Sequence, residues 1–420
     1  MKKIIGPFSQ LLSMDHLASK GPLKDEQLEV IKNGALITDG ASILKVGDFS
    51  KLIRQHPSIG VEEIEGEHIA LPGLIDCHTH ICFGGSRARD YAARNNGKTY
   101  QEIASEGGGI WDTVTKTRAA SQEELEASML HRLDLLLARG ITTVEVKSGY
   151  GLSYEQELKL LRAIKNAGER HHSHIISSCL AAHIIPREFD CESDYLDFIL
   201  SELVPKIKKE KLTKRFDIFI EQHAFTPLKS TNYLKSLTYQ GFDITVHGDQ
   251  FTTGGSEVAI EVGASSVDHL EASTEKEIKK LAQSDTVPVV LPGASLGLGL
   301  PFSPARKLLD AGCGMAIASD WNPGSAPNGN LLTQAALLGA YEKLSTAEVF
   351  AGITYRASDA LGLKDRAMLK EGMMADLVGF PCKDYREILY HQGELQPSKV
   401  WKNGLRMEPG MPINNDLTKV

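Results

Sequence analysis

The chain has 420 residues, of which 42% are apolar and 24% charged, a balance typical of soluble globular proteins. Its 54 acidic and 46 basic residues give a formal net charge of −8 with no long basic run, which excludes a nucleic acid as the expected partner. We expect a cytoplasmic protein without a membrane partner, for three reasons. The cysteines are scattered without C-x-x-C spacing, no apolar stretch is long enough to span a membrane, and we find no secretion signal.

The first 68 residues contain short strand-like runs separated by turns. Similar runs return near the other end, so the candidate strands at the two ends are 34–38, 42–46, 375–380 and 399–404. Asp39-Gly40 between the first two is a hairpin signal. Because chain termini often lie close in space, we expect residues 1–68 and 367–420 to build one small β-sandwich domain together.

Residues 69–366 alternate between strand-like and helical stretches. The strand candidates are 69–75, 141–147, 175–182, 216–221, 243–247, 265–268, 286–291 and 313–319. Ser121 and Glu124 form a capping box that opens an amphipathic helix, which Gly140 closes. This alternation predicts an α/β fold, a (β/α)₈ TIM-like barrel. A doubly wound open sheet is the alternative, disfavoured because no G-x-G-x-x-G follows the first strand.

Polar side chains follow most of these strands at their carboxyl ends, the face at which α/β barrels carry their sites. His78 and His80 follow the first strand, and residues spaced i, i+2 in an extended segment present their side chains to the same face. The others are Glu145, Lys147, His183, Glu221, His247, Asp268, His269 and Asp320. One histidine at a strand end is usually a hydrogen-bonded structural residue, but this repetition at one face favours a shared site.

Two histidines, a third histidine and an aspartate are a plausible ligand set for one metal with a position left open for water. Imidazole nitrogen suits zinc or iron. Asp320 would both bind the metal and accept a proton from the water. Because bound zinc brings the pKa of water toward neutrality, the pattern predicts a hydrolase.

These residues resemble the amidohydrolase superfamily, with P-G-x-I-D-x-H-x-H at 72–80, histidines after the fifth and sixth strands and an aspartate after the eighth. Within it, other segments are most similar to the imidazolonepropionase family, namely 83–87, 107–110, 145–151, 182–183 and 320–325. The resemblance covers nearly the whole chain. It implies hydrolysis of 4-imidazolone-5-propanoate to N-formimidoyl-L-glutamate in L-histidine degradation, in which water attacks the ring carbonyl and the cyclic amide C–N bond opens.

The resemblance also implies roles for individual residues. The divalent metal, zinc or iron, one per chain, would be held by His78, His80, His247 and Asp320. Substrate would be contacted by Arg87, Tyr150, His183, Gln250, Asn322, Gly324 and Ser325. His269 would assist proton transfer together with Asp320, and the chain would form a homodimer.

Residue chemistry supports the role given to Arg87 and restricts the role given to Gln250. Arg87 offers a planar fork that fits the substrate's propionate. Some family members carry Glu where this chain has Gln250, and an amide can form hydrogen bonds to the ring but cannot act as a general acid or base. The strand 216–221 lacks the bridging lysine of two-metal superfamily members, which favours a single metal. Lys147, after the second strand, we interpret as structural or as a neighbour of the ligands.

Two other functions remain open from the sequence. Another amidohydrolase, such as a deaminase of a nitrogen heterocycle, would use the same ligands but would release ammonia at once. A metal-free scaffold protein of this fold is the alternative from a different class. The presence of all four candidate ligands disfavours the scaffold, and a metal assay on the purified protein distinguishes it.

Overall fold

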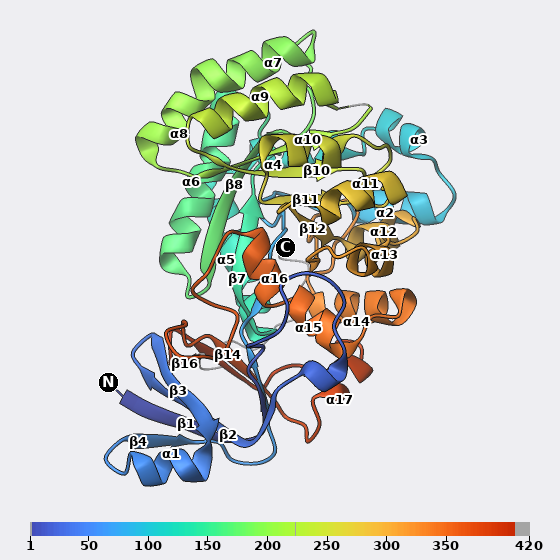
Figure 1. Cartoon of the computed structure of the whole chain (residues 1–420). Helices are drawn as coiled ribbons and strands as arrows, with labels where there is room; N and C mark the ends of the chain where they lie inside the picture. The colour runs from blue at the N-terminus through green and yellow to red at the C-terminus, as the bar shows by residue number, and fades with distance from the viewer. Residues whose placement is uncertain (1, 223, 408–420) are drawn as a thin grey trace.

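The computed structural model describes residues 2–222 and 224–407. They form a helix-covered barrel and, at one end of the molecule, a smaller β-unit in which the first and last parts of the chain meet (Figure 1). Within these residues, no helix combines the length and apolar character needed to cross a membrane. All six cysteines lie in the described part, and each is a free thiol.

Eight parallel strands make the barrel. In chain order they are β6 (Leu74–Asp76), β7 (Ile141–Lys147), β8 (His174–Ala182), β9 (Arg215–Ile220), β10 (Asp243–Gly248), β11 (Ser266–His269), β12 (Val287–Val290) and β13 (Ala316–Ile317). Each pairs with its neighbours in sequence order. A parallel bridge between Thr79 and Trp321 links the chain after β6 to the chain after β13, where His80 N donates to Trp321 O at 3.0 Å. The predicted TIM-like barrel is confirmed.

Helices connect these strands. Those of the barrel are α2 (Ala88–Asn95), α3 (Tyr100–Ser105), α4 (Ile110–Ala119), α5 (Gln122–Ala138), α6 (Tyr154–Arg170), α7 (Glu192–Phe198), η2 (Ile199–Leu203), α8 (Val204–Glu210), α9 (Pro227–Tyr239), α10 (Gly255–Val262), α11 (Glu275–Ala282), α12 (Pro292–Leu298), α13 (Ala305–Asp310), α14 (Leu331–Glu342), α15 (Thr346–Gly352) and α16 (Tyr355–Ala360). The expected capping box opens α5, since Ser121 Oγ accepts from Glu124 N at 3.1 Å and Glu124 Oε2 accepts from Ser121 N at 2.8 Å. Gly140, with φ of +84°, follows its end.

The two ends of the chain form one mixed sheet. Its strands are β1 (Lys2–Leu12), β2 (Val30–Asp39), β3 (Ser42–Asp48), β4 (Gly60–Glu63), β5 (Ile69–Pro72), β14 (Leu377–Phe380), β15 (Lys399–Lys402) and β16 (Leu405–Met407), accompanied by η1 (Asp25–Gln27), α1 (Phe49–Gln55) and α17 (Arg386–Tyr390). The predicted hairpin is the antiparallel pair β2–β3. Side chains alternate between two apolar clusters, with Ile4 and Ala35 facing Leu52 of α1, and Ile5 facing Trp401 on the other side. The expected β-unit built from both termini is confirmed.

The run 69–75, expected to be the first barrel strand, divides at Gly73. β5 before it pairs with β1 and β14 in the mixed sheet, whereas β6 after it pairs with β7 in the barrel. A Cβ on Gly73 would lie 2.3 Å from Thr142 Oγ1, so only glycine fits where the chain changes sheets. The single-strand prediction was wrong because both halves are fully buried and their apolar pattern is continuous.

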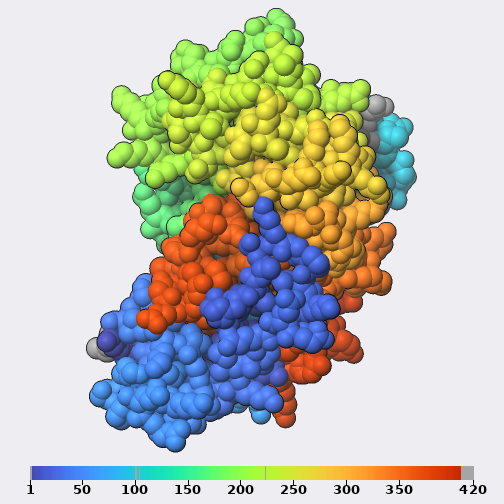
Figure 2. Space-filling view, in the orientation of Figure 1, coloured from blue at the N-terminus to red at the C-terminus, as the bar shows by residue number. Residues whose placement is uncertain are grey.

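The mixed sheet therefore reaches past residue 68. The division into a domain of 1–68 plus 367–420 and a barrel of 69–366 stays a prediction, and its last part, 408–420, lies outside the described residues. Figure 2 shows the N-terminal part of the chain extending from the β-unit onto the barrel beside the C-terminal part. There the buried Arg356 of α16 donates to Gly21 O at 2.8 Å.

Candidate active site

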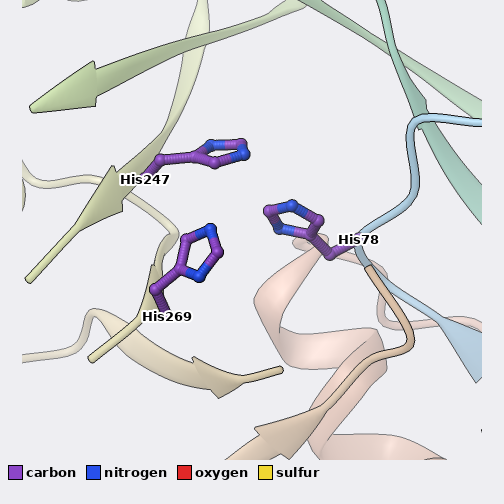
Figure 3. Close-up of side chains that lie close together, drawn as sticks. All are labelled: His78, His247 and His269. Carbon is purple, nitrogen blue, oxygen red and sulfur yellow. The ribbon is translucent and has the colours of Figure 1, made fainter. Parts of the chain in front are cut away.

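Four side chains predicted from the sequence to be metal ligands meet at the carboxyl end of the barrel: His78, His80, His247 and Asp320. Nε2 of His80 lies 3.1 Å from Nε2 of His78 and 3.3 Å from Nε2 of His247. Oδ1 of Asp320 lies 3.5 Å from His78 Nε2 and 3.4 Å from His80 Nε2. Figure 3 shows His78 and His247 directed toward each other from opposite parts of the barrel. All four side chains are buried.

The contacts behind two of these imidazoles determine which nitrogen faces the centre. His78 Nδ1 lies 2.7 Å from Asp268 Oδ2, and His247 Nδ1 lies 2.9 Å from Asp217 Oδ2. A carboxylate is only an acceptor, so each Nδ1 carries the proton and each Nε2 presents a lone pair. His80 differs, because no carboxylate contacts its Nδ1 among the described residues and its ring stacks on His183 with the centroids 5.6 Å apart.

This arrangement fits a bound cation. Lone pairs that face one another repel unless a positive charge lies between them. With metal–nitrogen bonds of about 2.1 Å, tetrahedral ligand atoms are separated by roughly 3.4 Å, close to the 3.1–3.5 Å found for four of the six pairs. Burial lowers the pKa of His78, His80 and His247, which favours the neutral imidazole that binds metals.

Asp320 is the one anionic member of this group. It has φ of +50°, in the left-handed region, at the point where the chain leaves the barrel after β13. Burial raises the pKa of its carboxyl group to about 7, although the nearby His269 lowers it. A cation at the centre would favour the ionised form.

His183 and Tyr150 lie beside His80 on the neighbouring strand ends. The ring of Tyr150 is 6.0 Å from that of His80 and 5.5 Å from that of His183. His183 Nδ1 lies 3.1 Å from Gly149 O, so it donates there and leaves Nε2 free of the proton. Burial lowers the pKa of His183 to about 3. These two rings therefore form an uncharged wall next to the metal ligands.

Arg87 lies just before α2 and is held by Asp90. Its Nε donates to Asp90 Oδ2 at 2.9 Å, and the same oxygen accepts from Gly109 N at 2.8 Å. A Cβ on Gly324 would lie 2.4 Å from Arg87 Nη1, so the outer part of the guanidinium lies against the loop after β13. Sequence analysis missed Asp90, although its i, i+3 spacing from Arg87 at a helix start could have indicated it.

The side chain of Asn322 organises the loop that contains Gly324 and Ser325. Its Nδ2 donates to Asp320 O at 2.7 Å and to Ser325 Oγ at 2.9 Å. Its Oδ1 accepts from Gly324 N at 2.7 Å and from Ser325 N at 2.8 Å. Two donors and two acceptor positions are all that an amide has, so the loop uses all of them.

His269 points toward the same centre but has a different partner. Figure 3 shows it directed toward His78 and His247, and one ligand nitrogen from each of these three histidines lies within 4.8 Å of the other two. Its Nδ1 lies 3.6 Å from Glu271 Oε2, an ion-pair distance, and neither atom has a hydrogen-bond partner among the described residues. Burial opposes the charged form, but Glu271, Asp320 and Asp268 together raise the pKa of His269.

Gln250 is also buried, two residues after the end of β10. The loop around it is held by Glu221, whose Oε1 accepts from Phe251 N at 2.8 Å and whose Oε2 accepts from Thr252 Oγ1 at 2.6 Å. The sequence suggested Glu221 only as a polar residue at a strand end. In the structure it supports the backbone next to Gln250 rather than facing the metal ligands.

Comparison with known proteins gives related chains over nearly the full length. A model of the amidohydrolase family matches residues 96–404. The imidazolonepropionase of Bdellovibrio bacteriovorus is 38% identical, with 95% of each chain covered. The imidazolonepropionase of Rubrobacter xylanophilus is 40% identical, over 93% of this chain and 95% of the relative.

Solved structures with the same fold are more distant in sequence. A triazine hydrolase variant has a TM-score of 0.75 at 17% identity, covering 100% of this chain and 97% of the other. An atrazine chlorohydrolase from Arthrobacter aurescens, complexed with zinc, has a TM-score of 0.71 at 16% identity, covering 99% and 98%. At this level of identity the likeness supports the fold alone.

Proposed function

The chain belongs to the imidazolonepropionase family of the amidohydrolases, and we propose that it hydrolyses 4-imidazolone-5-propanoate to N-formimidoyl-L-glutamate in L-histidine degradation. Water adds to the ring carbonyl and the cyclic amide C–N bond breaks, so one water is consumed and no ammonia is released. The single observation that carries this proposal is the convergence of three neutral imidazoles and one carboxylate in the barrel, together with a partly buried arginine anchored by Asp90.

We propose that His78, His80, His247 and Asp320 together bind one divalent metal ion, zinc or iron. When bound, such an ion supplies Lewis-acid activation of water and of the ring carbonyl. Four of the six separations among the ligand atoms of this set lie between 3.1 and 3.5 Å, the range that a tetrahedral ion requires. Strand β9 offers no lysine to bridge a second metal, which supports a single ion.

On the substrate side, Arg87 binds the propionate. Asp90 holds its Nε, so the two terminal nitrogens remain for a bidentate contact with a carboxylate. Tyr150 and His183 flank the ring. Gln250 contributes hydrogen bonds only, because an amide does not exchange protons in this pH range.

The loop after β13 closes the substrate side. Ser325 and Gly324 contact the substrate directly, and Asn322 acts by holding both of them in place, since its own donors and acceptors are used within the loop. Replacing Asn322 by a smaller side chain would therefore alter the positions of Ser325 and Gly324 before it removed any direct contact.

Proton transfer falls to Asp320 and His269. Asp320 accepts a proton from the attacking water, and His269 donates one to the departing ring nitrogen. The contact with Glu271 favours the protonated form of His269, which is the form that a general acid needs. Gln250 takes no part in these transfers.

The test is to mix the zinc-loaded protein with 4-imidazolone-5-propanoate and follow the loss of its absorbance. We expect a product heavier by one water and no free ammonia. Release of ammonia from a nitrogen heterocycle, with the imidazolone left unchanged, would instead support the deaminase alternative. A protein that binds zinc and leaves both substrate classes unchanged would overturn the hydrolase proposal.

We also propose that the protein is a homodimer, as the resemblance to its family implies. Light scattering coupled to size-exclusion chromatography should then give twice the chain mass of 45.8 kDa. A mass equal to one chain at micromolar concentration would contradict this.

A further inference from the structure

Lys147, the last residue of β7, is a fully buried cation that the proposed reaction does not use. Its Nζ lies 2.8 Å from Asp217 Oδ2, 2.9 Å from Glu145 Oε2 and 3.5 Å from Asp268 Oδ2. Three carboxylates from three different strands thus surround one ammonium group. Because a buried charge raises the free energy of the folded state unless it is paired, the three contacts with carboxylates hold the ammonium group in one position.

Two of these carboxylates contact metal-ligand imidazoles through the same oxygen that contacts Lys147. Asp217 Oδ2 lies 2.9 Å from His247 Nδ1, and Asp268 Oδ2 lies 2.7 Å from His78 Nδ1. Lys147 is therefore connected, through one intervening carboxylate in each case, to two candidate ligands that come from opposite parts of the barrel. The third carboxylate, Glu145, is also held from another direction by Arg215 Nε at 3.1 Å.

We propose that Lys147 is a positioning residue for the metal centre, because its ammonium holds Asp217 and Asp268 in the places from which they orient His247 and His78. This inference rests on the proposed function, since it requires that these histidines bind the metal. Carboxylates behind ligand histidines fix the tautomer and the ring orientation. Here a single side chain fixes two such carboxylates at once.

Loss of the ammonium would change both contacts together. Glu145 would keep its contact with Arg215 Nε at 3.1 Å, whereas Asp217 and Asp268 would lose the ammonium that they share. Neighbouring carboxylates without a counter-ion repel each other or take up protons. In either case the oxygens that now contact Nδ1 of His78 and of His247 would move, and the imidazoles would no longer be held with Nε2 toward the centre.

The molecule contains a matched control. Lys402 of β15 is another buried lysine, paired with Asp376 in the mixed sheet, where the partner contacts no candidate metal ligand. Lys147→Met and Lys402→Met both replace a buried ammonium by an apolar group of similar length. Both are expected to lower the thermal midpoint, but only the first removes a group connected to the metal ligands.

The experiment measures the zinc dissociation constant of each full-length variant by competition with a chromophoric chelator, after circular dichroism has shown that the variant is folded. We expect Lys147→Met to bind zinc 10–100-fold more weakly than the wild type. Lys402→Met should retain the wild-type zinc affinity. If Lys147→Met does not fold, Lys147→Gln, which keeps two N–H donors but not the charge, takes its place with the same expectation.

Two outcomes would overturn the inference. One is wild-type zinc affinity in the folded Lys147 variant, and the other is an equal loss of affinity in the Lys402 variant, which would indicate general destabilisation. A wild-type protein that binds no zinc or iron is a different result, because it removes the metal centre itself and with it the proposed function.

Discussion

The proposed metal-ligand half and the proposed substrate half of the site are held in different ways. His78 and His247 are oriented by Asp268 and Asp217, residues far away in the sequence. The substrate half is held locally, as Arg87 is fixed by Asp90 three residues later, and the loop after β13 by Asn322. The first half therefore depends on the register of the whole barrel, whereas the second can be altered one residue at a time. Single substitutions should therefore affect the function of one half without affecting that of the other.

The largest effect is expected where the ligand set itself is broken. His78→Ala removes one of four ligand atoms, so metal content and turnover should both fall to background. Elemental analysis and the absorbance assay measure the two quantities on the same sample. His171→Ala, at a remote histidine that contacts Asp134, should retain both. A metal-loaded, active His78→Ala protein would show that the ligand assignment is wrong.

The next largest effect is expected for substitutions that impair proton transfer. His269→Gln should keep its metal while kcat falls on the order of 10²–10⁴-fold, with a much smaller change in KM, because a general acid is lost. Glu271→Gln should lower kcat by less, since it removes only the carboxylate that supports protonation of His269. If His269→Gln loses its metal instead, His269 is a ligand, as its distance from His78 and His247 permits.

On the substrate side, Arg87→Lys keeps the charge but loses the planar fork. Loss of one charged hydrogen bond should weaken substrate binding by about 1–3 kcal/mol, seen as a higher KM with metal content unchanged. The exposed Arg89 provides the control, and Arg89→Lys should behave as the wild type. An unchanged KM for Arg87→Lys would place this residue outside the substrate pocket.

The smallest effect is expected at Gly324. An added methyl group would lie 2.4 Å from Arg87 Nη1, so this end of the side chain would have to shift slightly while Asp90 still holds its Nε. Gly324→Ala should therefore raise KM by less than Arg87→Lys and leave the thermal midpoint nearly unchanged. A KM increase larger than that of Arg87→Lys would mean that the substrate itself occupies the space beside Gly324.

Local patterns in the sequence predicted much of this protein correctly. The alternation of strands and helices predicted the barrel, Asp39-Gly40 predicted the hairpin, and Ser121 with Glu124 predicted the start of α5. Each of these signals arises from residues a few positions apart, so it can be read without knowledge of the fold. The pair of histidines at the end of the first barrel strand is also a local signal of this kind.

Other features were decided only by the tertiary structure. The run 69–75 changes sheets at Gly73, Asp268 contacts His78, and Lys147 joins the two carboxylates that contact His78 and His247. The partners of these contacts are far apart in the chain, 190 residues for Asp268 and His78 and 70 residues for Lys147 and Asp217. Their meeting depends on strand order and register in the closed barrel, which many residues fix together and no local pattern records.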